Sequence, residues 1–198
     1  LLRVSQALSH AHAAGLMHRD IKPENIMVTR EGRTVLMDFG MTLGIHAEIL
    51  GKTVAGGQSG IFGSLDFLSP EQIADEDVGL PSDIFSFGAL TYLLTTGHSA
   101  FQHKNPADIL RNILGVDHAP ATSHRPNIPG GLQELIGCCL VRAPEKRMRA
   151  REIAQTLEKA ITEHWKISPE AQLNRWLQTE YATGLANNSS KHMTETGE

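Results

Sequence analysis

A nine-residue run from Met17 to Asn25 constrains this chain more than any other feature, because it gathers several polar side chains into one short loop. Asp20 and Lys22 stand two residues apart, and Asn25 follows Asp20 by five positions. Pro23 fixes one backbone φ angle between Lys22 and Asn25. The run therefore predicts a stiff loop in which an acid, a base and an amide converge.

Two short apolar runs, 26–29 and 34–37, follow this loop and are separated by Arg30-Glu31-Gly32-Arg33. Such a pattern predicts a tight β-hairpin, with Gly32 supplying a positive φ angle. If the hairpin is symmetric about Glu31 and Gly32, Asn25 lies opposite Asp38 with Cα atoms roughly 5 Å apart. An amide oxygen and a carboxylate then face one site.

This group of side chains indicates phosphoryl transfer. Mg²⁺ prefers oxygen ligands and keeps several waters, so the pair Asn25 and Asp38 is enough protein to hold it on the phosphates of a nucleotide. Asp20 stays free to accept a proton. Lys22 offers a positive charge to the transferring phosphoryl group, whose transition state spreads negative charge over its oxygens.

Three motifs in this order resemble one known family. The run HRDIKPEN at 18–25 is followed by Asp-Phe-Gly at 38–40 and by Ser-Pro-Glu at 69–71, where Ala-Pro-Glu is usual. Together they strongly resemble the large, C-terminal lobe of the eukaryotic-type (Hanks-type) serine/threonine protein kinases, in a bacterial phrasing. The resemblance implies a mainly α-helical lobe with one small β-hairpin at the catalytic loop.

The resemblance also implies an activity and a role for each polar residue. The family transfers the γ-phosphoryl group of ATP to Ser or Thr hydroxyls of protein substrates, with ATP and Mg²⁺ as cofactors. Asp20 is then the base that orients the hydroxyl, and Lys22 the clamp on the phosphate. Asn25 and Asp38 are the Mg²⁺ ligands.

Four further residues receive structural roles from the same resemblance. His18 is expected to pack beneath the catalytic loop, and Asp83 to accept hydrogen bonds from the loop backbone. Arg147 is expected to form a buried ion pair with Glu71, and this pair fixes the segment that ends at Glu71.

The chain divides into three expected regions. Residues 1–164 form the lobe, with its catalytic loop at 18–25 and its activation segment at 38–71; residues 165–183 form an amphipathic helix, and 184–198 a disordered tail. The small lobe, which carries a Gly-rich loop and a strand Lys in the family, would lie upstream of Leu1, and the chain looks cut from something longer.

Helices are expected at 1–15, 82–96, 106–114, 132–141 and 151–165. The second of them has apolar residues on nearly every side from Ile84 to Leu94, which predicts a buried central helix. Ser82 is its expected N-cap and Gly97 its stop. His10 and His12, on the first helix, lack a carboxylate at metal-ligand spacing and are predicted to be structural.

The activation segment carries three features of interest. Ser64 matches the position where serine/threonine-directed kinases keep a Thr near the catalytic Asp, which favours Ser or Thr substrates over Tyr. Arg19 precedes that Asp, as in kinases whose Arg pairs with a phosphate on the segment, and Thr53 or Ser59 would carry it. The alternative is that Arg19 only bonds local carbonyl groups.

Composition limits the number of domains, the partners and the cellular compartment that are expected for this chain. Its 198 residues are 40% hydrophobic, which suits one globular domain, and a net charge of −4 gives no reason to expect nucleic acid as a partner. Cys138 and Cys139 are adjacent, which favours reduced core thiols and a cytoplasmic protein. A membrane tether outside this chain is left open, since no apolar run of about 18 residues occurs within it.

Two rival functions belong to other classes. The first is a pseudokinase-like interaction module, and the intact set of Asp20, Asn25 and Asp38 argues against it. The second is a small-molecule phosphotransferase of the aminoglycoside type, which also uses a catalytic Asp and a downstream Asn. Arg19, Lys22 and the Ser-Pro-Glu segment point away from that class.

Overall fold

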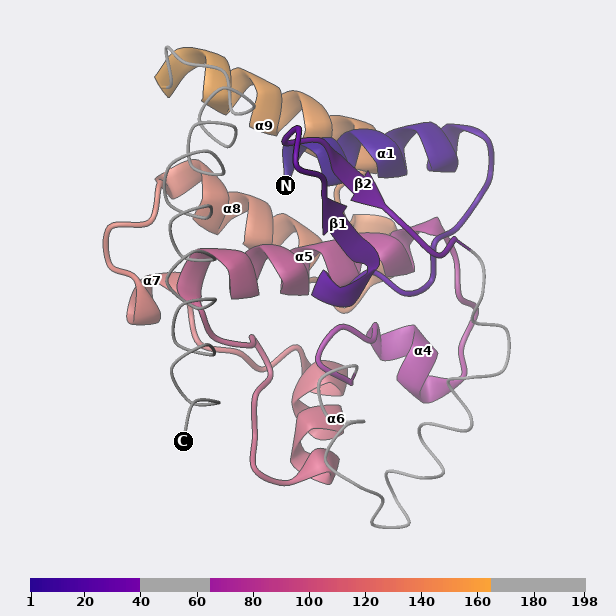
Figure 1. Ribbon diagram of the computed structural model, residues 1–198. Helices are drawn as coiled ribbons and strands as arrows, with labels where there is room; N and C mark the ends of the chain where they lie inside the picture. The colour runs from indigo at the N-terminus through magenta and orange to yellow at the C-terminus, as the bar shows by residue number, and fades with distance from the viewer. Residues whose placement is uncertain (40–64, 165–198) are drawn as a thin grey trace, which may run out of the picture.

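The computed structural model describes residues 1–39 and 65–164. This part of the chain is mainly helical, with one two-stranded antiparallel sheet (Figure 1). Its elements in chain order are α1 (Leu2–Ala13), η1 (Pro23–Asn25), β1 (Ile26–Val28), β2 (Thr34–Leu36), α4 (Pro70–Ala74), α5 (Leu80–Thr96), α6 (Pro106–Gly115), α7 (Ala121–His124), α8 (Gly130–Cys139), η2 (Pro144–Lys146) and α9 (Ala150–His164). The expected amphipathic helix at 165–183, the tail at 184–198 and most of the activation segment lie outside the described residues.

Helix α5 occupies the centre of the molecule, with α8 and α7 packed against it (Figure 1). Side chains from Ser82 to Tyr92 are buried on all sides, as the apolar pattern predicts. A Cβ added at Gly88 would lie 2.6 Å from the Cβ of Cys139, so α5 and α8 can approach this closely only because residue 88 is glycine. Gly97 ends the helix in the left-handed region, at φ 76°, as predicted.

Helices α1 and α9 pack side by side, although they lie at opposite ends of the described chain (Figure 1). Val4 and Leu8 of α1 and Ile153 and Leu157 of α9 all belong to the buried core. The helix expected at 151–165 is therefore confirmed as α9, and these two of its residues lie in the core. Gly15, at φ 73°, lies just after α1 where the predicted stop falls.

Helices α4 and α6 lie on the other side of α5 from α1 and α9 (Figure 1). Helix α4 packs against α6 (Figure 1), and α7 falls between the helices expected at 106–114 and 132–141, where the sequence predicts no helix. Asn105 caps α6 by accepting a hydrogen bond from the amide of Ala107, and Pro106 fills its first position. Among the described residues, none of the helices is long and apolar enough to cross a membrane.

The β1–β2 hairpin exists, but its predicted register is wrong by one residue. Ile26 pairs with Leu36, and the amide of Met37 donates to the carbonyl of Asn25 at 2.8 Å. The turn closes with three residues rather than four, because Gly32 takes φ 76° and the amide of Thr29 donates to Arg33. Asn25 therefore lies opposite Met37 and not opposite Asp38.

Three other local predictions are also wrong. Helix α5 begins at Leu80 with Gly79 as its N-cap, so the hydroxyl of Ser82 is free to bond elsewhere. Cys138 is exposed, and only Cys139 is the core thiol that was expected. Leu94, near the end of α5, is 58% exposed, so the predicted burial of this helix does not extend to that residue.

Candidate active site

The backbone of the predicted catalytic loop is held from below by one buried carboxylate. Asp83 of α5 accepts hydrogen bonds from the amides of His18 at 2.8 Å and Arg19 at 2.7 Å, which confirms its predicted role. The same carboxylate accepts a third bond from Nε2 of His12 on α1, at 2.8 Å. One side chain thus connects α1, the loop and the central helix.

The ring of His18 lies fully buried beneath the loop, and both of its nitrogens are hydrogen-bonded. Its Nε2 lies 2.7 Å from the carbonyl oxygen of Met37, and the amide of Asp20 donates to its Nδ1 at 3.3 Å. The tautomer with hydrogen on Nε2 satisfies both contacts. Phe39 packs on the same ring with centroids 4.5 Å apart, so the end of the hairpin and the loop share one anchor.

Three of the four predicted site residues are brought into direct contact. Oδ2 of Asp20 accepts a bond from Nζ of Lys22 at 2.8 Å and one from Nδ2 of Asn25 at 2.9 Å. Nδ2 of Asn25 also donates to the main-chain oxygen of Asp20 at 2.7 Å. Because both donated bonds use the nitrogen of Asn25, its amide oxygen is left to face a cation. Asp20 and Lys22 remain partly open, with side chains 25% and 18% exposed.

The fourth predicted residue, Asp38, is placed next to the cluster by the backbone. It follows Met37, whose amide bonds to the carbonyl of Asn25, and it is exposed in a left-handed conformation at φ 62°. No hydrogen bond joins its carboxylate to Asp20 or Lys22 within residues 1–39 and 65–164. Arg19, on the other side of the site, is left-handed too, at φ 72°.

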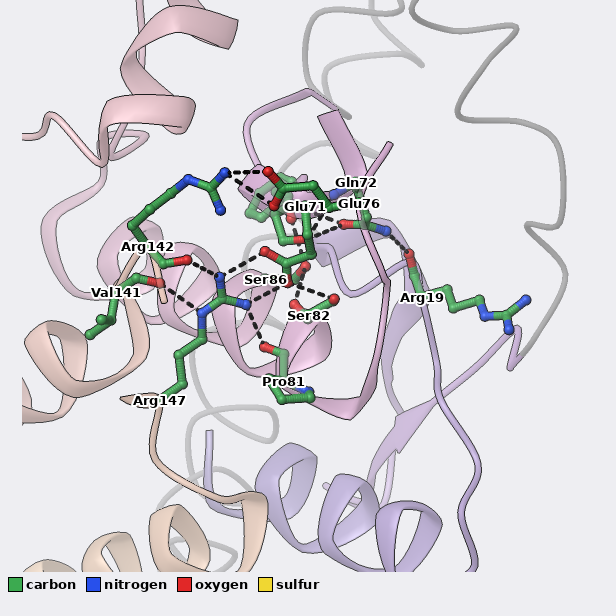
Figure 2. Close-up of polar contacts among 12 residues, drawn as sticks. Arg19, Glu71, Gln72, Glu76, Pro81, Ser82, Ser86, Val141, Arg142 and Arg147 are labelled. Carbon is green, nitrogen blue, oxygen red and sulfur yellow. Dashed lines mark hydrogen bonds and ion pairs between the residues drawn. The ribbon is translucent and has the colours of Figure 1, made fainter. Parts of the chain in front are cut away.

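A second polar network is centred on Arg147 and Glu71, whose side chains are buried (Figure 2 shows its contacts). Arg147 pairs with Glu71 through two bonds, Nη1 to Oε1 at 2.6 Å and Nη2 to Oε2 at 2.8 Å, which confirms the predicted ion pair. Its remaining donors reach the carbonyl oxygens of Val141, Pro81 and Arg142. All five N–H groups of this guanidinium are therefore hydrogen-bonded.

Helix α5 contributes hydroxyl groups to the same network. Ser82 donates to Oε1 of Glu71 at 2.6 Å, and Ser86 donates to the carbonyl of Phe67 at 2.6 Å. Burial acts to raise the pKa of Glu71, but the hydrogen bonds from Arg147 and Ser82 outweigh it and hold that pKa below its ordinary value. Glu71 is thus kept as a carboxylate in a buried position.

Asp66 is the exception among these satisfied groups. Its Oδ1 is the one buried side-chain oxygen or nitrogen that lacks a hydrogen-bond partner in the described part of the chain. Burial raises the pKa of Asp66, and a hydrogen bond from Ser99 opposes that shift only in part.

The sequence analysis missed Gln72, which joins α4 to the loop. Gln72 closes a capping box with Ser69, and its Nε2 donates to the carbonyl of Arg19 at 3.2 Å (Figure 2). The pattern Ser-x-x-Gln at 69–72 signals the capping box. No sequence signal reports the bond to Arg19 or that of His12 to Asp83, because each joins residues more than 50 positions apart.

The predicted features at Ser64, Thr53 and Ser59 fall outside the described residues. Arg19 itself is described, and its guanidinium points away from the network around Glu71 (Figure 2).

Comparison with known proteins places this geometry in a family. Residues 1–157 match the protein kinase domain. Serine/threonine-protein kinase PknL of Mycobacterium tuberculosis is 36% identical over 140 residues, which cover 71% of this chain and 34% of the relative. Serine/threonine-protein kinase PknA of the same species is 31% identical over 150 residues, 76% of this chain and 33% of the relative. A probable serine/threonine-protein kinase of Clostridium perfringens, CPE1738, is 31% identical over 159 residues, 80% of this chain and 22% of the relative.

The chain therefore spans about a third or less of the length of these curated relatives. The family match nevertheless covers most of the chain and includes the loop, the hairpin and both buried anchors, Asp83 and Arg147. On that match, and on relatives that are bacterial serine/threonine kinases, the chain belongs to the protein kinase family.

Proposed function

We propose that residues 1–164 form the large, C-terminal lobe of a cytoplasmic serine/threonine protein kinase, which transfers the γ-phosphoryl group of ATP to Ser or Thr hydroxyls of protein substrates. One observation carries the proposal. A single oxygen of Asp20 accepts hydrogen bonds from Lys22 and Asn25, while Asp83 holds the backbone of the residue before Asp20. A carboxylate set in this way can accept the proton of an incoming hydroxyl group.

The four site residues fit a nucleotide with Mg²⁺. The amide oxygen of Asn25 and the exposed carboxylate of Asp38 are hard oxygen donors, and Mg²⁺ takes few protein ligands. When bound, Mg²⁺ neutralises charge that develops on the phosphate oxygens. Asp20 orients the hydroxyl group and takes its proton. Lys22, held 2.8 Å from Asp20, offers its ammonium to the transferred phosphoryl group.

The surface beside the hairpin supports the assignment to a large lobe. Five large apolar side chains in this part of the chain are well exposed: Leu16, Met27, Val28, Val35 and Phe39, at 60%, 44%, 46%, 39% and 40%. Several exposed apolar side chains in one short stretch of sequence support a surface that another segment covers. We infer that a small lobe packs here and encloses the adenine. Residues 1–198 alone should then turn over ATP far more slowly than the complete protein, measured at equal concentrations, because on this inference the small lobe completes the nucleotide site.

The decisive experiment uses the complete natural protein that contains this chain. We expect it to transfer labelled phosphate from ATP to a Ser or Thr protein substrate and not to an aminoglycoside. Asp38→Ala should abolish Mg²⁺-dependent nucleotide binding in titration calorimetry, performed with and without the metal. Asp117→Ala, which removes an exposed carboxylate after α6, is the matched control.

The result separates the three candidate functions. Nucleotide binding without transfer in the unaltered protein would favour the interaction module. Transfer confined to small molecules would favour the other phosphotransferase class. Mg²⁺-dependent binding that survives Asp38→Ala would remove Asp38 from the metal site.

A further inference from the structure

Gln72 uses both ends of its side-chain amide, and the two ends do different things. Its Oε1 accepts bonds from the amide of Ser69 at 2.8 Å and from the Ser69 hydroxyl at 3.1 Å, which closes the N-terminus of α4. Its Nε2 donates to the carbonyl of Arg19 at 3.2 Å, 53 residues away in the sequence. Gln72 as a whole residue is 7% exposed, so water does not readily replace these bonds.

The acceptor of the second bond is a strained residue. Arg19 is a non-glycine residue at φ 72°, a conformation that L-amino acids adopt only where the surroundings impose it. Its amide is fixed by Asp83 at 2.7 Å, and its carbonyl is fixed by Gln72. Two side chains from two different helices, α5 and α4, therefore hold the two polar groups of one left-handed residue (Figure 2 shows the bond from Gln72).

The carbonyl that Gln72 holds belongs to the peptide group between Arg19 and Asp20. A peptide group is planar, so fixing its oxygen also fixes its nitrogen, which is the amide of Asp20. That amide donates to Nδ1 of His18, and the carboxylate of Asp20 is then placed against Lys22 and Asn25. The hydrogen bond from Gln72 therefore holds the peptide group that leads directly into Asp20, the proposed catalytic residue.

Capping alone does not require glutamine at position 72. Glutamate also closes a capping box, because its carboxylate accepts the same bonds from Ser69. Only glutamine offers a donor to Arg19 at the same time. The oxygen of the Gln72 amide caps α4 and its nitrogen bonds to Arg19. A single substitution can therefore remove one function and keep the other.

We propose that Gln72 is a positioning residue for Asp20: it fixes the peptide plane before Asp20 by donating to the Arg19 carbonyl, and so couples α4 to the geometry of phosphoryl transfer. This inference rests on the proposed kinase function. It assigns Gln72 no contact with substrate or nucleotide. Its effect should therefore fall on kcat and not on the KM for ATP.

The test compares two variants of the complete natural protein. Gln72→Glu keeps the acceptor for Ser69 but loses the donor to Arg19. Ser69→Ala loses the capping hydroxyl but keeps that donor. We expect Gln72→Glu to lower kcat roughly 10- to 100-fold with the KM for ATP within about threefold, because a small misplacement of a reacting group has effects of this size. We expect Ser69→Ala to lower the thermal midpoint while kcat stays within about twofold.

Gln72→Met serves as a second variant of similar size without a donor, and it should lower kcat in the same way if Gln72→Glu does not fold. Equal kcat values for Gln72→Glu and the unaltered protein would overturn the inference while the kinase function stands. The inference would also be overturned if, in both Gln72→Glu and Ser69→Ala, the loss of kcat were simply proportional to the loss of thermal midpoint. An unaltered protein without any phosphotransfer would overturn the proposed function, and the inference with it.

Discussion

The site around Asp20 and the network around Arg147 are both polar, but they are built in opposite ways. In the network, the side chains of Glu71 and Arg147 are 1% and 0% exposed, and every N–H group of Arg147 is bonded to protein. In the site, the side chains of Asp20 and Lys22 are 25% and 18% exposed. Two residues near them, Arg19 and Asp38, take left-handed backbone conformations.

The difference shows which region can bind a ligand. A group whose bonds are all made to protein has nothing left for a substrate, so the Arg147 network can only hold other parts in place. The oxygens of Asp20, Asn25 and Asp38, in contrast, can still accept bonds from a substrate. The site thus combines left-handed backbone with oxygens that can still accept bonds, while the residues that secure it are buried behind it.

The sharpest test of this division is Asp20→Asn in the complete protein. Phosphotransfer should fall on the order of 10²- to 10⁴-fold, because an amide cannot accept the proton of the hydroxyl group. The thermal midpoint should hardly change, since Asp20 is partly exposed and its neighbours remain. Steady-state kinetics with labelled ATP and a thermal melt measure the two effects. A variant within threefold of the unaltered rate would remove Asp20 from the mechanism.

The opposite pattern is expected for Arg147→Ala. It leaves the buried carboxylate of Glu71 without its partner, and breaking one side of such a pair costs about 3–5 kcal/mol of unfolding free energy. Chemical denaturation measures the loss. Glu71→Leu combined with Arg147→Leu is the control, because removing both charges should cost much less than removing one. An Arg147→Ala variant of unchanged stability would mean that the network does not anchor the lobe.

The sequence predicts the site better than it predicts the details of the backbone. Asp20, Lys22 and Asn25 converge because one short loop carries all three, and the pair of Glu71 with Arg147 follows from motif resemblance. The hairpin register is missed because Gly32 with a positive φ angle suits a three-residue turn and a four-residue turn alike, and the two differ in whether Arg33 lies in the loop or pairs with Thr29. That choice depends on the folded turn, and composition leaves it open.

Contacts between distant segments account for the other misses. Serine is a common helix N-cap, but α5 begins before Ser82, with Pro81 in its first turn. The hydroxyl of Ser82 instead donates to the buried Glu71. The bonds from Gln72 to Arg19 and from His12 to Asp83 depend on how helices pack. Local patterns contain no record of such packing, so only the structure reveals them.

The buried network should also make the stability of the fold depend on acid. The pKa of Glu71 lies below its ordinary value of 4.5, even though burial acts to raise it, because the bonds from Arg147 and Ser82 favour the carboxylate. A lowered pKa stabilises the fold fully above the ordinary value, and that contribution is lost as pH falls through the folded-state value. Thermal midpoints between pH 3 and 7 should therefore drop at the acid end, and Glu71→Gln should flatten that drop. A Glu71→Gln variant with the same acid profile would place the sensitivity elsewhere.

The smallest effect is expected where an ion pair of the same chemistry lies on the surface. Arg142 contacts both carboxylate oxygens of Glu76, at 2.9 and 3.1 Å, close to the Glu71–Arg147 pair, but these side chains are 41% and 50% exposed (Figure 2). Glu76→Gln should therefore lower the free energy of unfolding by less than about 1 kcal/mol. Solvent screens this pair, so the loss should shrink as salt is added, whereas the cost of Arg147→Ala should not. If Glu76→Gln costs as much as Arg147→Ala, burial is not what separates the two pairs, and the anchoring network extends to the surface of the lobe.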